Sequence, residues 1–103
     1  EEGSAAAQAQ GLLPKSTVVG AFQNLSARDL LDTDRPVDCD VVVCADDGGA
    51  KALVMALAEK IDGVRAVDGG ELQNARYVEE LTALLLNINR VYRARSTIRI
   101  VGI

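Results

Sequence analysis

The sequence contains no histidine and no tryptophan, and its only aromatic residues are Phe22, Tyr77 and Tyr92. Without histidine there is no histidine-based catalytic triad and no histidine ligand for a metal ion. Neither a G-x-G-x-x-G sequence nor a Walker A sequence is present, so the chain holds no complete phosphate-binding loop of either type. We therefore predict no catalytic side chain and no metal ligand.

Cysteine and positive charge are also scarce. Cys39 and Cys44 are too few for a disulfide framework and lack zinc-site spacing, so we interpret them as packed thiols in a reducing compartment. A net charge of −4 disfavours a nucleic-acid partner. No apolar run approaches the roughly 18 residues of a membrane span. The amino end lacks signal-peptide features, so we expect no membrane partner and a cytoplasmic location.

The longest segment that reads as one element is 71–93, where apolar residues recur at steps of three and four, as in an amphipathic helix. A second apolar stripe of Tyr77, Leu84 and Val91 indicates that the helix is covered by more than one partner surface. Thr82 lies in the apolar middle. A buried hydroxyl without a partner costs about 1 to 3 kcal/mol, so Thr82 must bond a backbone group, a second chain, a cleft or a ligand. The helix therefore either packs in the centre of the hydrophobic core or lines one side of a ligand-binding site.

The rest of the pattern is typical of an α/β protein. We expect a helix over 4–13 and a helical turn from Ser26 through Leu31. A further helix should begin with a cap by Asp46 or Asp47 and end at Gly63. Its apolar stripe consists of Leu53, Val54, Leu57, Ala58 and Ile61. Strands are expected over 17–22, 41–45, 64–67 and 97–101. The charged segment 32–38 is the expected surface loop.

Two further clusters have both structural and functional interpretations. Gly48 and Gly49 precede a helix and could receive a phosphate, but the acidic residues before them favour a helix cap. Arginines gather near the carboxyl end, where they can complement the helix dipole or bind an anion; they are Arg90, Arg93, Arg95 and Arg99.

Several stretches together resemble a known family. DCDVVVCADD, VDGGELQNARYVEELT and LLNINR are similar to the carboxyl-terminal part of the coenzyme F420-dependent NADP oxidoreductases, also called NADPH-dependent F420 reductases. TVVGAFQNLSA resembles that family's crossing from its dinucleotide-binding domain into its smaller domain. The resemblance implies that residues 1–24 end a Rossmann-type parallel sheet. Residues 25–103 would then form a small α/β carboxyl-terminal domain with a long buried helix.

The resemblance also implies a function: reversible hydride transfer between NADPH and the deazaflavin coenzyme F420. In the family, side chains matching Gln23 and Leu25 border the deazaflavin, and the threonine matching Thr82 hydrogen-bonds it. The backbone N–H matching Ala27 meets the nicotinamide carboxamide. Some members carry histidine or asparagine at the position of Gln23. The cofactors expected are NADP(H) and coenzyme F420, and they supply the chemistry.

Two other functions stay open at this point. One is a noncatalytic interaction or dimerisation module whose long helix packs on a partner; the other is a related NADP-dependent reductase with a flavin or metal acceptor. Because the family's glycine-rich NADP-phosphate site is not in this sequence, we expect a fragment that is inactive by itself. We also expect a homo-oligomer, since an orphan strand at 17–22 would pair with another copy.

Overall fold

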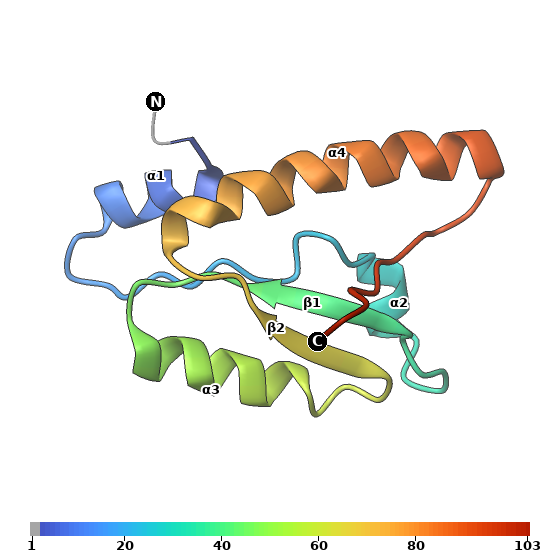
Figure 1. Cartoon of the computed structure of the whole chain (residues 1–103), viewed down its shortest axis with the longest axis horizontal. Coiled ribbons are helices and arrows are strands. Elements are labelled where there is room, and N and C mark those ends of the chain that lie inside the picture. Colours follow the sequence, from blue (N-terminus) through green and yellow to red (C-terminus); the bar gives the residue numbers. More distant parts are fainter. Residues whose placement is uncertain (1–2) are drawn as a thin grey trace.

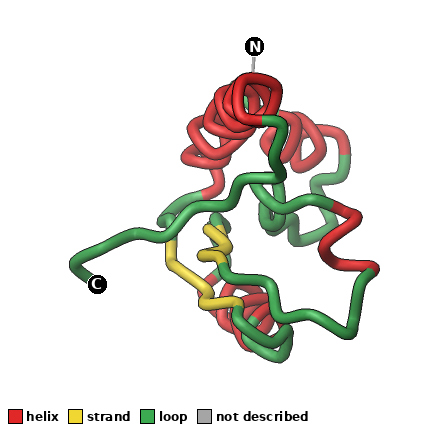
Figure 2. The backbone as a smooth tube through the Cα atoms, turned by 90° about the vertical axis from the view of Figure 1, so that its right-hand side faces the viewer, coloured by secondary structure: helices red, strands yellow, loops and turns green. Residues whose placement is uncertain are grey.

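The computed structural model describes residues 3–103. Its elements are α1 (Ala5–Leu12), α2 (Ala27–Leu31), β1 (Cys39–Val43), α3 (Gly48–Ala58), β2 (Val64–Asp68), the 3-10 helix η1 (Leu72–Asn74) and α4 (Ala75–Tyr92). The two strands lie between α3 on one side and α4 with α1 on the other (Figures 1 and 2). This arrangement confirms the α/β class and the long helix near the carboxyl end.

The sheet consists of β1 and β2, which run parallel with Cys39 opposite Val64 and Val43 opposite Asp68. Helices on both faces explain why β1 is a continuous apolar run rather than an alternating one. Val41 and Val43 are fully buried, and Leu25, Val37 and Ala58 pack in the same core cluster. The strands expected at 41–45 and 64–67 are therefore present, the first shifted by two residues.

The strand expected at 17–22 is absent, and that prediction was wrong. Only Gly20 pairs, through one antiparallel bridge to Cys44. The reason is local. The Val18 N–H donates to the Gln10 side chain at 3.0 Å instead of to a neighbouring strand, and Phe22 has a positive φ of 69°, which ends the extended backbone.

The strand expected at 97–101 is also absent. Ile98 accepts one backbone hydrogen bond from Asp40 at 2.7 Å. The next N–H on that side, from Ile100, donates to a side-chain oxygen of Asp40 rather than to a strand carbonyl. Because this carboxylate takes the place of a ladder partner, the segment follows β1 without forming a strand.

The helices α1, α2 and α3 begin at the capping residues that the sequence predicted or one residue from them. Side-chain oxygens of Ser4, Ser26 and Asp47 accept from backbone N–H groups two or three residues on, as N-caps do. α3 ends at Ala58, earlier than expected, and Gly63 has the predicted left-handed backbone with φ at 88°. The stripe on α3 is only partly covered, since Leu53 and Leu57 are exposed.

α4 buries one face only, so the expectation of a helix buried on more than one side was wrong for the described residues. Ala75, Val78 and Leu85 are buried, whereas the second stripe of Tyr77, Leu84 and Val91 is more than half exposed. Within residues 3–103, this face packs on α1, on Val42 and Cys44 at the end of β1, and on the bend at Gln23. The helix ends at Tyr92, and the left-handed backbone of Arg93 forms the C-cap.

The boundary predicted after residue 24 stays a prediction. Val19, Ala21 and Phe22 pack on the same core cluster as Leu25. None of the helices described over 3–103 is both long and apolar enough to cross a lipid bilayer.

Candidate functional site

A pocket of about 270 Å³ lies between the bend at 23–26 and the middle of α4. It is lined by residues from three parts of the chain: Gln23, Asn24, Leu25 and Ser26 from the bend, Thr82, Leu85, Leu86 and Asn89 from α4, and Arg95 and Ser96 from the segment that follows. Three of the four predicted cofactor-binding residues, Gln23, Leu25 and Thr82, are thus brought together.

Thr82 joins the bend to the helix. Its hydroxyl lies 2.8 Å from the Gln23 carbonyl oxygen and 3.0 Å from the Val78 carbonyl oxygen of its own helix. A hydroxyl has one proton to donate, so the two carbonyls share it, and the lone pairs of Oγ1 stay available to accept a hydrogen bond. The sequence required a partner for this hydroxyl, and the bend at Gln23 provides one.

The amides of Gln23 and Asn24 bring unpaired oxygens to this part of the structure. Asn24 is 4% exposed and its Nδ2 donates to the Asp40 carbonyl at 2.9 Å. Asn24 Oδ1 and Gln23 Oε1 are buried and have no hydrogen-bond partner among residues 3–103. Native structures rarely leave buried polar atoms unpaired without a reason such as a ligand. Asn24, which lines the partly apolar pocket, therefore leaves an acceptor for a ligand with a hydrogen-bond donor, whereas the Gln23 amide lies near Gly20 and Ala75, at the start of α4.

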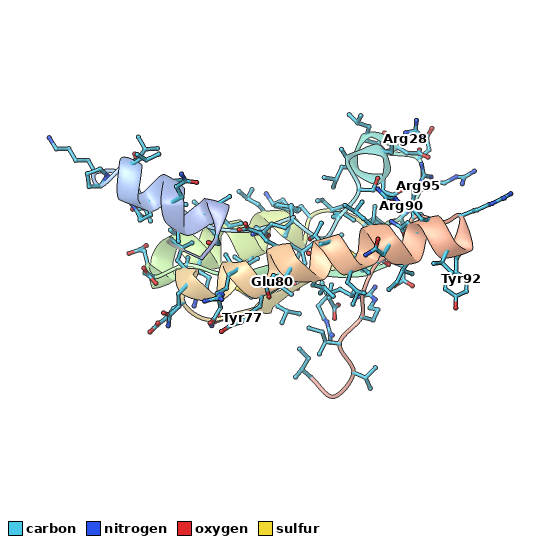
Figure 3. The ribbon with its side chains drawn as sticks, turned by 90° about the horizontal axis from the view of Figure 1, so that it is seen from above. Arg28, Tyr77, Glu80, Arg90, Tyr92 and Arg95 are labelled. Atoms are coloured by element: carbon cyan, nitrogen blue, oxygen red, sulfur yellow. The ribbon has the colours of Figure 1, made fainter. Side chains whose placement is uncertain are left out.

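The carboxyl-terminal wall of the pocket is held by local polar contacts. Asn89 Oδ1 accepts from the Ser96 backbone N–H at 2.7 Å and from the Ser96 hydroxyl at 2.6 Å. Arg95 lies 3.3 Å from the Asp29 carboxylate and points toward α2, on the side of α4 opposite Tyr77 (Figure 3). Because Arg95 is paired, its first role is structural.

Asp40 anchors both the bend and the tail. Its carboxylate is fully buried and accepts four hydrogen bonds, two from Arg65, one from Arg99 and one from the Ile100 N–H. The Arg65 side chain, with the Ile100 N–H and Arg99, holds the pKa of Asp40 well below its usual range against the opposing effect of burial. Through its carbonyl the same residue holds Asn24, so the pocket is fixed to the core.

The other candidates have structural places. Cys39 and Cys44 are buried and free, and burial raises the pKa of both thiols, which confirms packed thiols. Asp47 caps the helix start at Gly48, as the cap interpretation predicted. Ala27 does not line the pocket; it is the first residue of α2, where a helix leaves its backbone N–H without an intrahelical partner.

Asn24 belongs to the stretch 23–27 that resembles the family's cofactor-facing segment, but sequence reasoning assigned it no contact of its own. Its position after Gln23 at the end of the apolar run 17–22 was a weak signal, because polar residues commonly end a strand. Ser96 was missed for a similar reason, since it directly precedes the segment 97–101 that was expected to form a strand.

Sequence comparison supports the resemblance inferred above. No protein-family model matches the chain. The chain is 47% identical over 96 residues to the F420-dependent NADP reductase of Methanocaldococcus jannaschii, covering 93% of this chain and 43% of that protein. It is 48% identical over 97 residues to the enzyme of the same name from Methanothermobacter marburgensis, covering 92% of this chain and 43% of that protein.

The chain therefore spans less than half the length of these relatives, which it matches in their carboxyl-terminal part. A solved structure from an Arthrobacter species, provisionally assigned as an F420-dependent NADP reductase, superposes with a TM-score of 0.83 over 94% of this chain and 46% of that one. At 24% identity this match shows a shared fold. The predicted resemblance to the carboxyl-terminal part of the F420-dependent NADP reductases is confirmed.

Proposed function

We propose that this chain forms the deazaflavin-binding wall of an F420-dependent NADP reductase, an oxidoreductase that transfers a hydride between NADPH and coenzyme F420. The observation that carries the proposal is the pocket that joins Gln23 and Leu25 to Thr82, residues far apart in the sequence. The names of the relatives, at 47% and 48% identity, supply the identity of the two cofactors.

The residues of the chain have positioning roles in this proposal. Thr82 Oγ1 accepts a hydrogen bond from the deazaflavin, while Leu25 and Leu85 present apolar surface to the ring and keep water away. The Ala27 N–H donates to the nicotinamide carboxamide. When bound, the two cofactors supply the hydride donor and acceptor, so the protein needs only to hold their rings in contact.

The proposal does not require activity from this chain by itself. A pocket of about 270 Å³ is slightly smaller than the roughly 300 to 1,000 Å³ of most small-molecule sites, so it suits a ring system rather than a whole cofactor. The helix start at Gly48 and Gly49 is capped by Asp47, which places a carboxylate where a phosphate would bind. We expect deazaflavin binding without turnover.

Thr82 gives a direct test of the proposal. Replacing Thr82 with valine keeps the shape but removes the hydroxyl, and we expect F420 to bind about 3- to 10-fold more weakly, because one neutral hydrogen bond contributes about 0.5 to 1.5 kcal/mol. Titration followed by deazaflavin fluorescence measures this, with riboflavin as a competitor that tests the alternative flavin acceptor.

The matched control is Thr82→Ser, which keeps the hydroxyl and should bind F420 as the unsubstituted chain does. Equal binding by the valine and serine variants would contradict the role given to Thr82. Absence of F420 binding to the unsubstituted chain would contradict the proposed function itself.

One observation favours the alternative of an interaction or dimerisation module: the exposed stripe Tyr77, Leu84 and Val91 on α4. An uncovered apolar stripe along a long helix is typical of a helix–helix contact. We expect the chain to self-associate in sedimentation velocity, and Leu84→Glu to weaken association at least 10-fold. Ala83→Glu places the same charge on an exposed position off the stripe and should leave association unchanged.

A further inference from the structure

We propose that Asn24 determines which ring the pocket accepts, because its Oδ1 receives a hydrogen bond from an amide-type N–H on a flat heterocycle. This inference rests on the proposed function and deepens it. Asn24 lies in the bend between Gln23 and Leu25, and it is 4% exposed.

The orientation of the Asn24 amide is fixed by its environment. Nδ2 donates to the Asp40 carbonyl at 2.9 Å, and a flipped amide would set two oxygens against each other at this distance. Asp40 cannot move away to relieve such a clash, because its carboxylate is held by Arg65 and Arg99. Oδ1 is therefore the atom that is left for another partner.

Asn24 Oδ1 has no hydrogen-bond partner among residues 3–103, although the residue lines the pocket. A buried carbonyl oxygen left unpaired destabilises the fold, so a ligand that supplies a donor recovers this free energy on binding. The oxygen is out of contact with solvent, so ligand entry must include a small side-chain rearrangement at this end of the pocket. Gln23 Oε1 is also unpaired, but its amide lies near Gly20 and Ala75, so the inference rests on Asn24 alone.

Both rings of the proposed reaction carry the required group. The pyrimidinedione part of a deazaflavin has a cyclic imide N–H, and the nicotinamide has a carboxamide N–H. A ring of the same shape without such a donor would leave Oδ1 buried and unpaired, and sites of this kind reject analogues that lack the hydrogen-bonding group. Asn24 thus selects by hydrogen bonding, whereas Leu25 and Leu85 select by shape.

The experiment compares two ligand pairs on the unsubstituted chain and on Asn24→Leu, by calorimetry. One pair is a 5-deazaflavin and its analogue methylated on the imide nitrogen; the other is NADP+ and its N,N-dimethylcarboxamide analogue. For one pair we expect the unsubstituted chain to prefer the N–H compound by about 10-fold, which corresponds to one hydrogen bond. The Asn24→Leu variant should show no preference. The pair that responds identifies the ring that Asn24 contacts.

Two controls distinguish failure of the role given to Asn24 from failure of the proposed function. Asn87→Leu, an exposed asparagine on α4 outside the pocket, should retain the preference. If Asn24→Leu fails to fold, the comparison of methylated and unmethylated ligands on the unsubstituted chain still decides the question. Binding of F420 with no preference in either pair would overturn the role of Asn24 alone, whereas no binding of F420 at all would overturn the proposed function and this inference with it.

Discussion

Replacing Asp40 with alanine should lower the free energy of unfolding by about 2 to 3 kcal/mol, because hydrogen bonds to a buried charged group contribute more than neutral ones, while the partly exposed arginines left behind can still be solvated. The fully buried carboxylate accepts hydrogen bonds from Arg65, Arg99 and the Ile100 N–H, and its loss leaves these donors without their shared partner. Urea unfolding followed by circular dichroism measures the change. Asp38→Ala is the control, because Asp38 is exposed and its bond to Arg99 should contribute less than about 1 kcal/mol.

The pH dependence of stability checks the same feature. Hydrogen bonds from Arg65 hold the pKa of Asp40 below its usual range, whereas in the unfolded chain it titrates near 4. Below about pH 4 the unfolded state therefore binds more protons than the folded state, and stability falls as the pH falls. Asp40→Asn does not titrate, so the stability difference between it and the unsubstituted chain should be constant above about pH 5 and narrow toward pH 2. A constant difference over the whole range would show that Asp40 has the same pKa in the folded and unfolded chains, and would contradict the role given to its hydrogen bonds.

Replacing Leu25 with alanine should destabilise the chain by about 2 to 3 kcal/mol and also weaken F420 binding. Leu25 is 9% exposed and packs in the core cluster with Val37 and Val41, so truncation removes buried surface and leaves a cavity. The same side chain lines the pocket. Urea unfolding and fluorescence titration on one preparation give the two quantities.

Leu25→Met separates the two roles of this residue. Methionine conserves the volume and should cost less than about 1.5 kcal/mol, while it presents a more flexible surface to the ring. Weaker F420 binding by Leu25→Met with nearly unchanged stability supports a direct contact. If binding follows stability in both variants, Leu25 is an ordinary core residue.

The sequence predicted well the features of the fold that depend only on residues close together in the chain. The apolar run around Val41 required cover on both faces and became the buried strand β1. Asp47 and Gly63 marked a helix cap and a left-handed turn through local backbone chemistry. Thr82 was found because a hydroxyl in an apolar stripe needs a partner, and the structure supplies the Gln23 carbonyl.

The features that were missed depend on side chains from distant positions. The run 17–22 has strand-like composition, but Gln10 takes one of its N–H groups. The segment 97–101 alternates like a strand, but the Asp40 carboxylate binds the N–H of Ile100. Asn24 was missed at the site for the same reason, since its unpaired oxygen appears only once Asp40 has fixed the other end of the amide.

Asp40 binds residues that lie far along the chain, and this separation affects the order in which the protein folds during synthesis. Asp40 bonds Arg65, 25 positions later, and Ile100, 60 positions later. During synthesis the chain emerges from the ribosome amino end first. β1 would therefore leave the exit tunnel well before Arg99, the second arginine that binds Asp40. Burying the Asp40 carboxylate before its partners are present would cost free energy. The nascent strand should stay open to solvent until Arg99 and Ile100 have emerged, so docking of the segment 97–103 is expected to be a late step in the folding of these residues.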